Sequence, residues 1–277
     1  MPNKRKKIGL ALSSGGIRGL AHVGVLAAFE KHGIPIDMIA GTSAGAIVGA
    51  LYARTMDADE TKRQTVDLVC RRLALLKDHD PTGSDLARGR KFEQWLKSAI
   101  GDVGFEELSI PFACVATDIA TGEPVVIKEG SVVEAVRAST AFPLLVSAVK
   151  WQNRHLLDGG LVSPVPVSAA RQLGADLVVA VDVVPDAGDM TDIETDRLES
   201  PDEPDPLFLM MRMFQIAGCQ AVRTSLEGAD VVIRPQLTHT GFSHHQIREF
   251  FLQGHLAAQR AIMELLRRMS ATVVDKR

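Results

Sequence analysis

The sequence predicts an α/β fold with a largely parallel central sheet, and three observations carry that prediction. Short runs of β-branched residues alternate with amphipathic segments of helical length, which is the pattern of repeated strand–helix units. Two strand-to-helix junctions carry glycine-rich motifs, "SSGGIRG" and "GTSAG". The run "ADLVVAVDVV" is apolar almost throughout, which is typical of a strand with both faces buried.

The first half of the chain predicts two strand–helix units in succession. A strand over "KIGLAL" leads through the first glycine motif into a helix over "LAHVGVLAAFEKHG", which ends at Gly33. A second strand over "PIDMIAG" leads to Ser43 and another helix. Helical periodicity returns at about 60–77 and around "KFEQWLKSAIG", and we predict a loop over "DHDPTGSDLARG" between them because Pro, Gly and Asp favour turns.

The second half adds strands, helices and one break in composition. "IPFACVATDIATGEPVVIKEG" predicts a β-hairpin that turns near Thr121 and Gly122, and "SVVEAVRASTAFP" predicts a helix capped by its first serine. The segment at about 185–206 holds nine acidic residues and predicts a mobile surface loop, either disordered or a flap. A Met-rich helix over 206–226, a strand over "ADVVIRP" and a helix over about 245–269 follow.

Composition limits the class of protein. The 277 residues are 46% hydrophobic, which suits a single globular domain over 1–277, and the formal net charge of −3 gives no sign of a nucleic-acid partner. No run approaches the ~18 apolar residues of a membrane span, and the basic start of the chain lacks the apolar region of a signal peptide. Three widely spaced cysteines and no cluster with ligand spacing indicate a cytoplasmic protein without metal or cofactor.

Ser43 is the first candidate for chemistry. It is the central residue of G-x-S-x-G, where Gly41 and Gly45 allow a sharp turn that exposes the serine hydroxyl, and the following helix directs free N–H groups at the same place. Chance produces this pattern fairly often, so a tightly turning small residue is the alternative. The position of the motif between an apolar strand and an apolar helix favours a nucleophile.

The loop "SSGGIRG" offers backbone donors at Gly15, Gly16 and Ile17 that can converge on an anion. An oxyanion hole and a nucleotide-phosphate cradle are both compatible with it. The dinucleotide fingerprint fails because Ser14 stands at its first glycine, and no Lys-Ser/Thr pair follows as in a P-loop. Arg18 either holds the loop or meets a substrate phosphate.

A base for Ser43 is harder to find. No downstream histidine stands in a strand-end loop after a matching acid; the candidates are His79, His155, His239, His244, His245 and His255. Asp158 in "LLDGGLVSPVPV" is the better candidate, since it ends an apolar strand and precedes Gly159 and Gly160, which let another backbone approach. A turn or a helix cap is the structural alternative for this aspartate.

Together the motifs "GGIRG", "GTSAG" and "DGG", in this order, resemble those of the patatin-like phospholipases, in particular the short bacterial members. The similarity extends to "ATDIATGEPV", "VRASTAFP", "VVIRPQL" and "GHLAAQRA", and so covers about residues 8–269. The resemblance implies a three-layer α/β/α fold and a Ser43–Asp158 dyad without histidine. It also implies an oxyanion hole at Gly15, Gly16 and Ile17, with Arg18 at the basic position of the loop. Ser14 and Ser163 depart from the glycine and asparagine that are common in the family.

The resemblance implies a lipid or another hydrophobic acyl ester as substrate, and hence a phospholipase A or lysophospholipase type of esterase, with peripheral contact at a membrane surface as one option. The helix over 206–226 would then line an acyl channel or lie on lipid, although packing on the core is its simpler role. Two alternatives stay open. One is a catalytically silent lipid-binding or regulatory protein of the same fold, and the other is a classical Ser-His-Asp α/β-hydrolase. The oligomeric state is open too.

Overall fold

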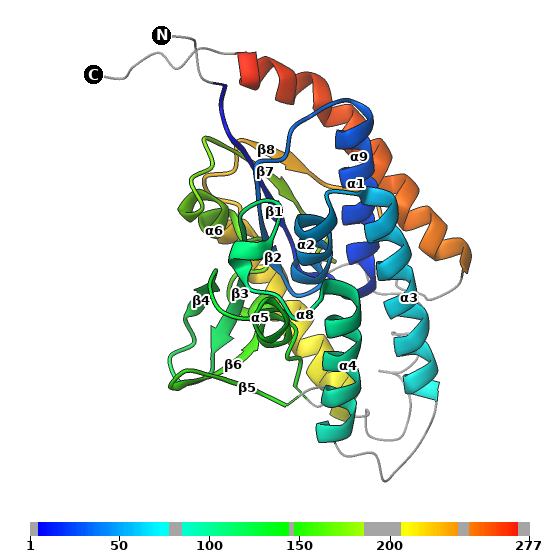
Figure 1. Ribbon diagram of the computed structural model, residues 1–277, viewed down its shortest axis with the longest axis vertical. Helices are drawn as coiled ribbons and strands as arrows, with labels where there is room; N and C mark the ends of the chain where they lie inside the picture. The colour runs from blue at the N-terminus through cyan, green and yellow to red at the C-terminus, as the bar shows by residue number, and fades with distance from the viewer. Residues whose placement is uncertain (1–4, 78–84, 144–146, 186–205, 238–243, 271–277) are drawn as a thin grey trace.

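The computed structural model describes residues 5–77, 85–143, 147–185, 206–237 and 244–270 (Figure 1). Within them an eight-stranded sheet has the order β5-β6-β3-β2-β1-β7-β8, and β4 pairs with β3. The strands are β1 (Ile8–Leu12), β2 (Met38–Thr42), β3 (Phe112–Asp118), β4 (Pro124–Ile127), β5 (Val149–Trp151), β6 (Arg154–Asp158), β7 (Leu177–Val181) and β8 (Val231–Ile233).

The helices follow the strands in the predicted alternation. They are the 3-10 turn η1 (Gly16–Gly19), α1 (Leu20–Lys31), α2 (Ala44–Thr55), α3 (Ala58–Lys77), α4 (Asp85–Ile100), α5 (Val132–Ser139), α6 (Val167–Gln172), α8 (Pro206–Ser225) and α9 (His244–Ser270), with short 3-10 turns at Phe105–Glu107 and Gly159–Leu161. Ser131 caps α5 as predicted, since its hydroxyl accepts a hydrogen bond from the N–H of Glu134.

The sheet is parallel at its centre and antiparallel at one side. β1 pairs in parallel with β2 and β7, and β2–β3 and β7–β8 are parallel too. The pairs β3–β4, β3–β6 and β5–β6 are antiparallel. The prediction of a largely parallel sheet is confirmed for the centre. The whole is a mixed sheet, because β4 of the predicted hairpin and β6 both run antiparallel to β3.

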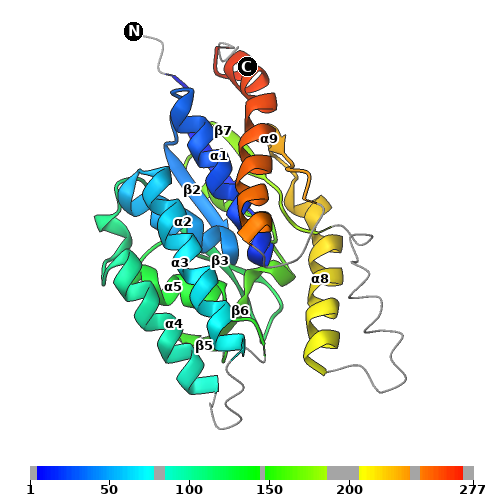
Figure 2. The same cartoon turned by 90° about the vertical axis from the view of Figure 1, so that its right-hand side faces the viewer.

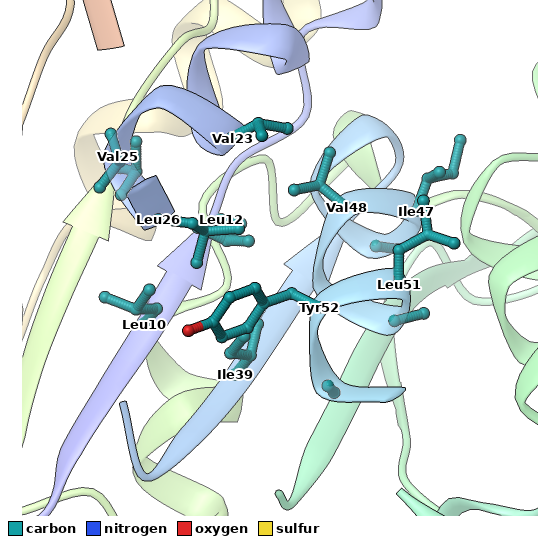
Figure 3. Close-up of a cluster of buried hydrophobic side chains, with 14 of the residues drawn as sticks. Leu10, Leu12, Val23, Val25, Leu26, Ile39, Ile47, Val48, Leu51 and Tyr52 are labelled. Carbon is teal, nitrogen blue, oxygen red and sulfur yellow. The ribbon is translucent and has the colours of Figure 1, made fainter. Parts of the chain in front are cut away.

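Helices cover both faces of the sheet, which gives the three layers that Figures 1 and 2 show. On one face, side chains of β1 and β2 such as Leu10, Leu12 and Ile39 pack against α1 and α2 (Figure 3). On the other face, Ala11, Ala40 and their neighbours pack against α6 and the end of α8. Successive residues of β1 face opposite layers, as the twofold repeat of a strand requires, and the three-layer prediction is confirmed.

One predicted loop is wrong at its end, residues 85–89. We predicted a loop over "DHDPTGSDLARG", residues 78–89, but α4 begins at Asp85. The end of that segment contains Leu, Ala and Arg, which favour helix more than Gly89 opposes it. The predicted acidic loop at 185–206 lies, apart from its ends, outside the described residues, and the prediction of a single domain stays a prediction. No helix in the described ranges is long and apolar enough to cross a membrane.

Candidate active site

Ser43 stands alone between β2 and α2, in a backbone conformation that few residues other than glycine adopt. Its φ is 53° and its ψ is −116°. Such a conformation persists only where the surrounding structure imposes it, and it is typical of a strand–nucleophile–helix elbow. The turn is so tight that a Cβ atom on Gly41 would lie 2.4 Å from the carbonyl oxygen of Gly45. The motif therefore forms the sharp turn that its glycines predicted.

The hydroxyl of Ser43 donates a hydrogen bond to Asp158, with 2.6 Å between Oγ and Oδ2. The register of β3 brings the two residues together. Thr42, the last residue of β2, pairs with Val115, and Asp158, the last residue of β6, pairs with Ala116. Because Val115 and Ala116 are consecutive, β2 and β6, which flank β3 on opposite sides, end at the same level beside the middle of β3.

Asp158 is held on three sides. Its Oδ1 accepts from the N–H of Gly160 at 2.8 Å, its own N–H donates to the carbonyl of Ala141, and its carbonyl accepts from the hydroxyl of Thr117. Only 3% of Asp158 is exposed. A Cβ on Gly159 would lie 2.2 Å from the carbonyl oxygen of Val115, so glycine is needed for β6 to turn away this close to β3.

The glycine loop lies directly against the elbow. A Cβ on Gly45 would lie 2.1 Å from the carbonyl oxygen of Leu12, and one on Gly19 would lie 2.6 Å from the Cβ of Ala44. These two glycines let the loop and the start of α2 touch. The first hydrogen bond of η1 runs from the N–H of Arg18 to Gly15, so the N–H groups of Gly16 and Ile17 precede the bonded turn and have no acceptor among the described residues.

Ser13 connects the glycine loop to the rest of the fold. Its hydroxyl accepts from the N–H of Val183 at 2.9 Å, and its carbonyl lies 2.8 Å from Nε2 of His22. His22 is fully buried on α1, and burial lowers its pKa from the ordinary 6.5 to about 4. The neutral ring therefore donates its Nε2–H to Ser13, and this contact fixes the strand end from which the loop begins.

Arg18 points away from solvent. It is 3% exposed, and its guanidinium donates a hydrogen bond of 2.8 Å to the carbonyl of Leu237, which follows β8. Of the two roles that the sequence left open for this residue, the geometry favours holding the loop over meeting a substrate phosphate.

Two sets of residues near the dyad were not singled out from the sequence. The N–H of Ser43 donates to the hydroxyl of Ser139 at 3.0 Å, and that hydroxyl donates to the carbonyl of Val115 at 2.6 Å. Phe142 and Phe214 form a tilted ring pair with centroids 4.7 Å apart. Ser139 and Phe142 lie in the block "VRASTAFP", whose similarity to the family was the only available signal. Nothing in the sequence placed Phe214 beside them.

The described histidines downstream of Ser43 lie at the surface or in a hollow formed by helices. His155 and His245 are exposed, and His255 lines a hollow between α1, α3 and α9. His79 and His239 lie outside the described residues, as does the side chain of His244. No group of three or more His, Cys, Asp or Glu in the described part of the chain is placed to hold a metal ion.

Curated relatives match part of this chain. An uncharacterised NTE family protein of Mycobacterium bovis is 36% identical over 175 residues, 63% of this chain and 48% of that protein. Lysophospholipase nte1 of Aspergillus fumigatus is 37% identical over 64% of this chain and 12% of its own length. Patatin-like phospholipase domain-containing protein 6 of Homo sapiens is 36% identical over 68% of this chain and 14% of its own. The chain thus spans about half the length of the mycobacterial relative and far less of the others.

Solved structures share the fold. VipD from Legionella pneumophila aligns with 95% of this chain and 67% of its own, with a TM-score of 0.55 and 13% identity. The type III effector ExoU aligns with 96% of this chain and 54% of its own, with a TM-score of 0.50 and 17% identity. The sequence model of the patatin-like phospholipases matches residues 10–171, which contain both glycine motifs and Asp158. By this match the chain belongs to the patatin-like phospholipase family.

Proposed function

We propose that this protein hydrolyses acyl esters of lipids, as a phospholipase A or lysophospholipase, with Ser43 as nucleophile and Asp158 as base. The observation that carries the proposal is the 2.6 Å hydrogen bond from the hydroxyl of Ser43, on its elbow, to Asp158. The lipid substrate class comes from the family and from the lysophospholipase named among the relatives. We also place the protein in the cytoplasm, because its three cysteines are few and widely spaced in the sequence.

In the first half-reaction, Oγ of Ser43 attacks the ester carbonyl carbon while its proton passes to Oδ2 of Asp158. The carbonyl oxygen becomes an oxyanion, which the N–H groups of Gly15, Gly16 and Ile17 stabilise. The bond to the alcohol then breaks, and that alcohol leaves with the proton from Asp158. The acyl group stays on Ser43 as an ester.

In the second half-reaction, Asp158 takes a proton from water, and the resulting hydroxide attacks the acyl-enzyme. Collapse of the second oxyanion releases the acid and returns the proton to Ser43. Aspartate is a weak base in water, so this mechanism relies on geometry. The carboxylate is already hydrogen-bonded to the nucleophile, and the N–H groups of Gly16 and Ile17 have no acceptor among the described residues. The hydrogen bond from Gly160 leaves Oδ2 directed at Ser43.

The test is labelling with a fluorophosphonate, which reacts with activated serines, together with hydrolysis of phosphatidylcholine and lysophosphatidylcholine. We expect the wild type to label and to release fatty acid, and Ser43→Ala to do neither. Failure of the wild type to label would indicate the silent protein of the same fold. Loss of labelling on substitution of His79, His239 or His244, with Asp158→Asn still active, would indicate a classical triad instead.

A further inference from the structure

Helix α8 has an exposed apolar stripe on its outer side. Leu209, Met213 and Ile216 are 41%, 68% and 45% exposed. Their spacing of four and three residues places them on one face of the helix over about two turns. The same face becomes polar further along, at the exposed residues Gln220 and Thr224. The stripe is therefore confined to the N-terminal half of α8 and ends at a polar boundary.

The inner side of α8 lies beside Asp158. A Cβ on Gly160 would lie 3.0 Å from the ring of Phe214 and 3.1 Å from Oδ1 of Asp158, so both side chains approach the same point. Phe214 also contacts Phe142. At the C-terminal end of α8, Val222 packs on the face of the sheet that carries Ala11 and Ala40. In Figure 2, α8 runs along the edge of the molecule, apart from α1 to α5. One side of the helix is thus fixed beside the site, and the other is open to solvent.

Helix α8 carries a net positive charge. Its twenty residues include no Asp or Glu, although the chain as a whole carries a net charge of −3. Its two charged residues, Arg212 and Arg223, are separated by about three helical turns and lie along one flank, next to Ile216. An apolar stripe bordered by arginines is the pattern of a helix that lies in the interface of an anionic bilayer.

We propose that the outer stripe of α8, formed by Leu209, Met213 and Ile216, docks on the surface of a phospholipid bilayer and presents lipid esters to Ser43. This inference rests on the proposed function, because the lipid substrate gives the surface its partner. Helix α9 also exposes apolar side chains, namely Leu252, Leu256, Met263 and Leu266, but it packs on α1, whereas α8 packs on the 3-10 turn Gly159–Leu161 that follows Asp158. Among the described helices, only α8 both exposes an apolar stripe and packs beside Asp158.

Binding is tested with vesicles of ether-linked phosphatidylcholine and phosphatidylglycerol in equal amounts, which contain no ester to hydrolyse. The variant is Met213→Glu, and its control is Met263→Glu, because both methionines are 68% exposed and lie on different helices. In a sedimentation assay we expect Met213→Glu to weaken binding about tenfold and Met263→Glu to change it less than about twofold. Equal effects of the two variants, or a larger effect of Met263→Glu, would overturn the proposal.

Activity separates this inference from the proposed function. With an ester dissolved as monomers, we expect Met213→Glu to match the wild type, whereas its hydrolysis of phospholipid vesicles falls with its binding. A wild type that cleaves neither substrate contradicts the proposed function, whatever the vesicle binding. A wild type that cleaves both, with Met213→Glu unchanged on vesicles, contradicts the docking surface alone. A loss of self-association by Met213→Glu with unchanged vesicle binding also overturns the proposal, in favour of a second copy of the chain as the partner.

Discussion

Ser43 and Asp158 are 115 positions apart in the chain, yet their side chains share a hydrogen bond of 2.6 Å because two strands end against consecutive residues of β3. The register of one buried strand therefore sets the distance between the proposed nucleophile and its base. A slip of one residue would turn Asp158 to the other face of the sheet. The predictions below test this arrangement and its supports.

Asp158→Asn keeps the shape of the side chain and removes the base. We expect kcat on a dissolved ester to fall about a thousandfold, within the range known for loss of a general base. The control is Asp118→Asn, since Asp118 is also buried on the sheet but pairs with Arg154 rather than with a nucleophile. A kcat for Asp158→Asn close to that of the control would remove Asp158 from the mechanism.

Ser139→Ala removes the hydroxyl that joins the N–H of Ser43 to the carbonyl of Val115. The carbonyl of Val115 is buried and the N–H of Ser43 is partly buried, and both lose their partner, so we expect a loss of about 1–3 kcal/mol in the free energy of unfolding. The elbow then loosens, so kcat should fall more than KM rises. Thr140→Ala is the control, because that hydroxyl bonds only within its own helix segment. Equal kinetics in the two variants would mean that Ser139 does not position the nucleophile.

Gly45→Ala should be among the most damaging substitutions in the chain. The added Cβ would lie 2.1 Å from the carbonyl oxygen of Leu12, and the backbone cannot yield without moving the glycine loop. We expect a loss of about 3 kcal/mol or more in denaturant unfolding, together with loss of labelling. Gly33→Ala introduces strain from a positive φ but no clash, and should cost about 1 kcal/mol with labelling intact.

Stability should depend on pH through His22. Burial lowers the pKa of His22 from 6.5 to about 4, so between these values the unfolded chain binds a proton at this residue and the folded protein does not. The neutral ring contributes about 3 kcal/mol to the free energy of unfolding. This contribution is complete above pH 6.5, declines as the pH falls and is lost by about pH 4. Between pH 6.5 and 4 the free energy of unfolding, measured by denaturant titration, should therefore fall more steeply for the wild type than for His22→Asn.

The control for His22 is His32→Asn, because the ring of His32 is bonded to the carbonyl of Ala28 at the end of α1 and the residue is exposed. We expect its stability to follow the pH dependence of the wild type. If the wild type and His22→Asn lose stability in parallel between pH 6.5 and 4, the buried ring is not the source of the effect.

Phe214→Ala opens the wall next to Asp158. An acyl chain that packs on this ring loses contact in proportion to its length, so kcat/KM should fall about tenfold for long-chain esters and less than about twofold for a butyrate ester. Phe92→Ala, which breaks the stacked pair with Trp95 on α4, serves as the control. Equal losses at every chain length would mean that Phe214 supports the base rather than the acyl group.

Local features of the active site could be predicted because they depend on neighbours in the chain. A strand, a serine between two glycines and a helix form an elbow wherever they occur in this order, and the glycine loop is encoded in the same way. The alternation of strands and helices and the cap of α5 were predicted from similarly short segments. The prediction of a loop up to Gly89 was wrong, because turn-forming residues and helix formers are mixed at 85–89, where α4 begins.

Contacts between distant segments needed the tertiary structure. The sequence supplied Ser43 and Asp158 as candidates, and their pairing came only from a resemblance; the hydrogen bond itself depends on the register of β3. The same holds for Ser139 under the elbow, for Phe214 against Gly160 and for the inward direction of Arg18. The sequence by itself determined which residues can do chemistry and which turns expose them. The packing of the sheet decided which of them meet, because strand register and helix placement are set by the whole core.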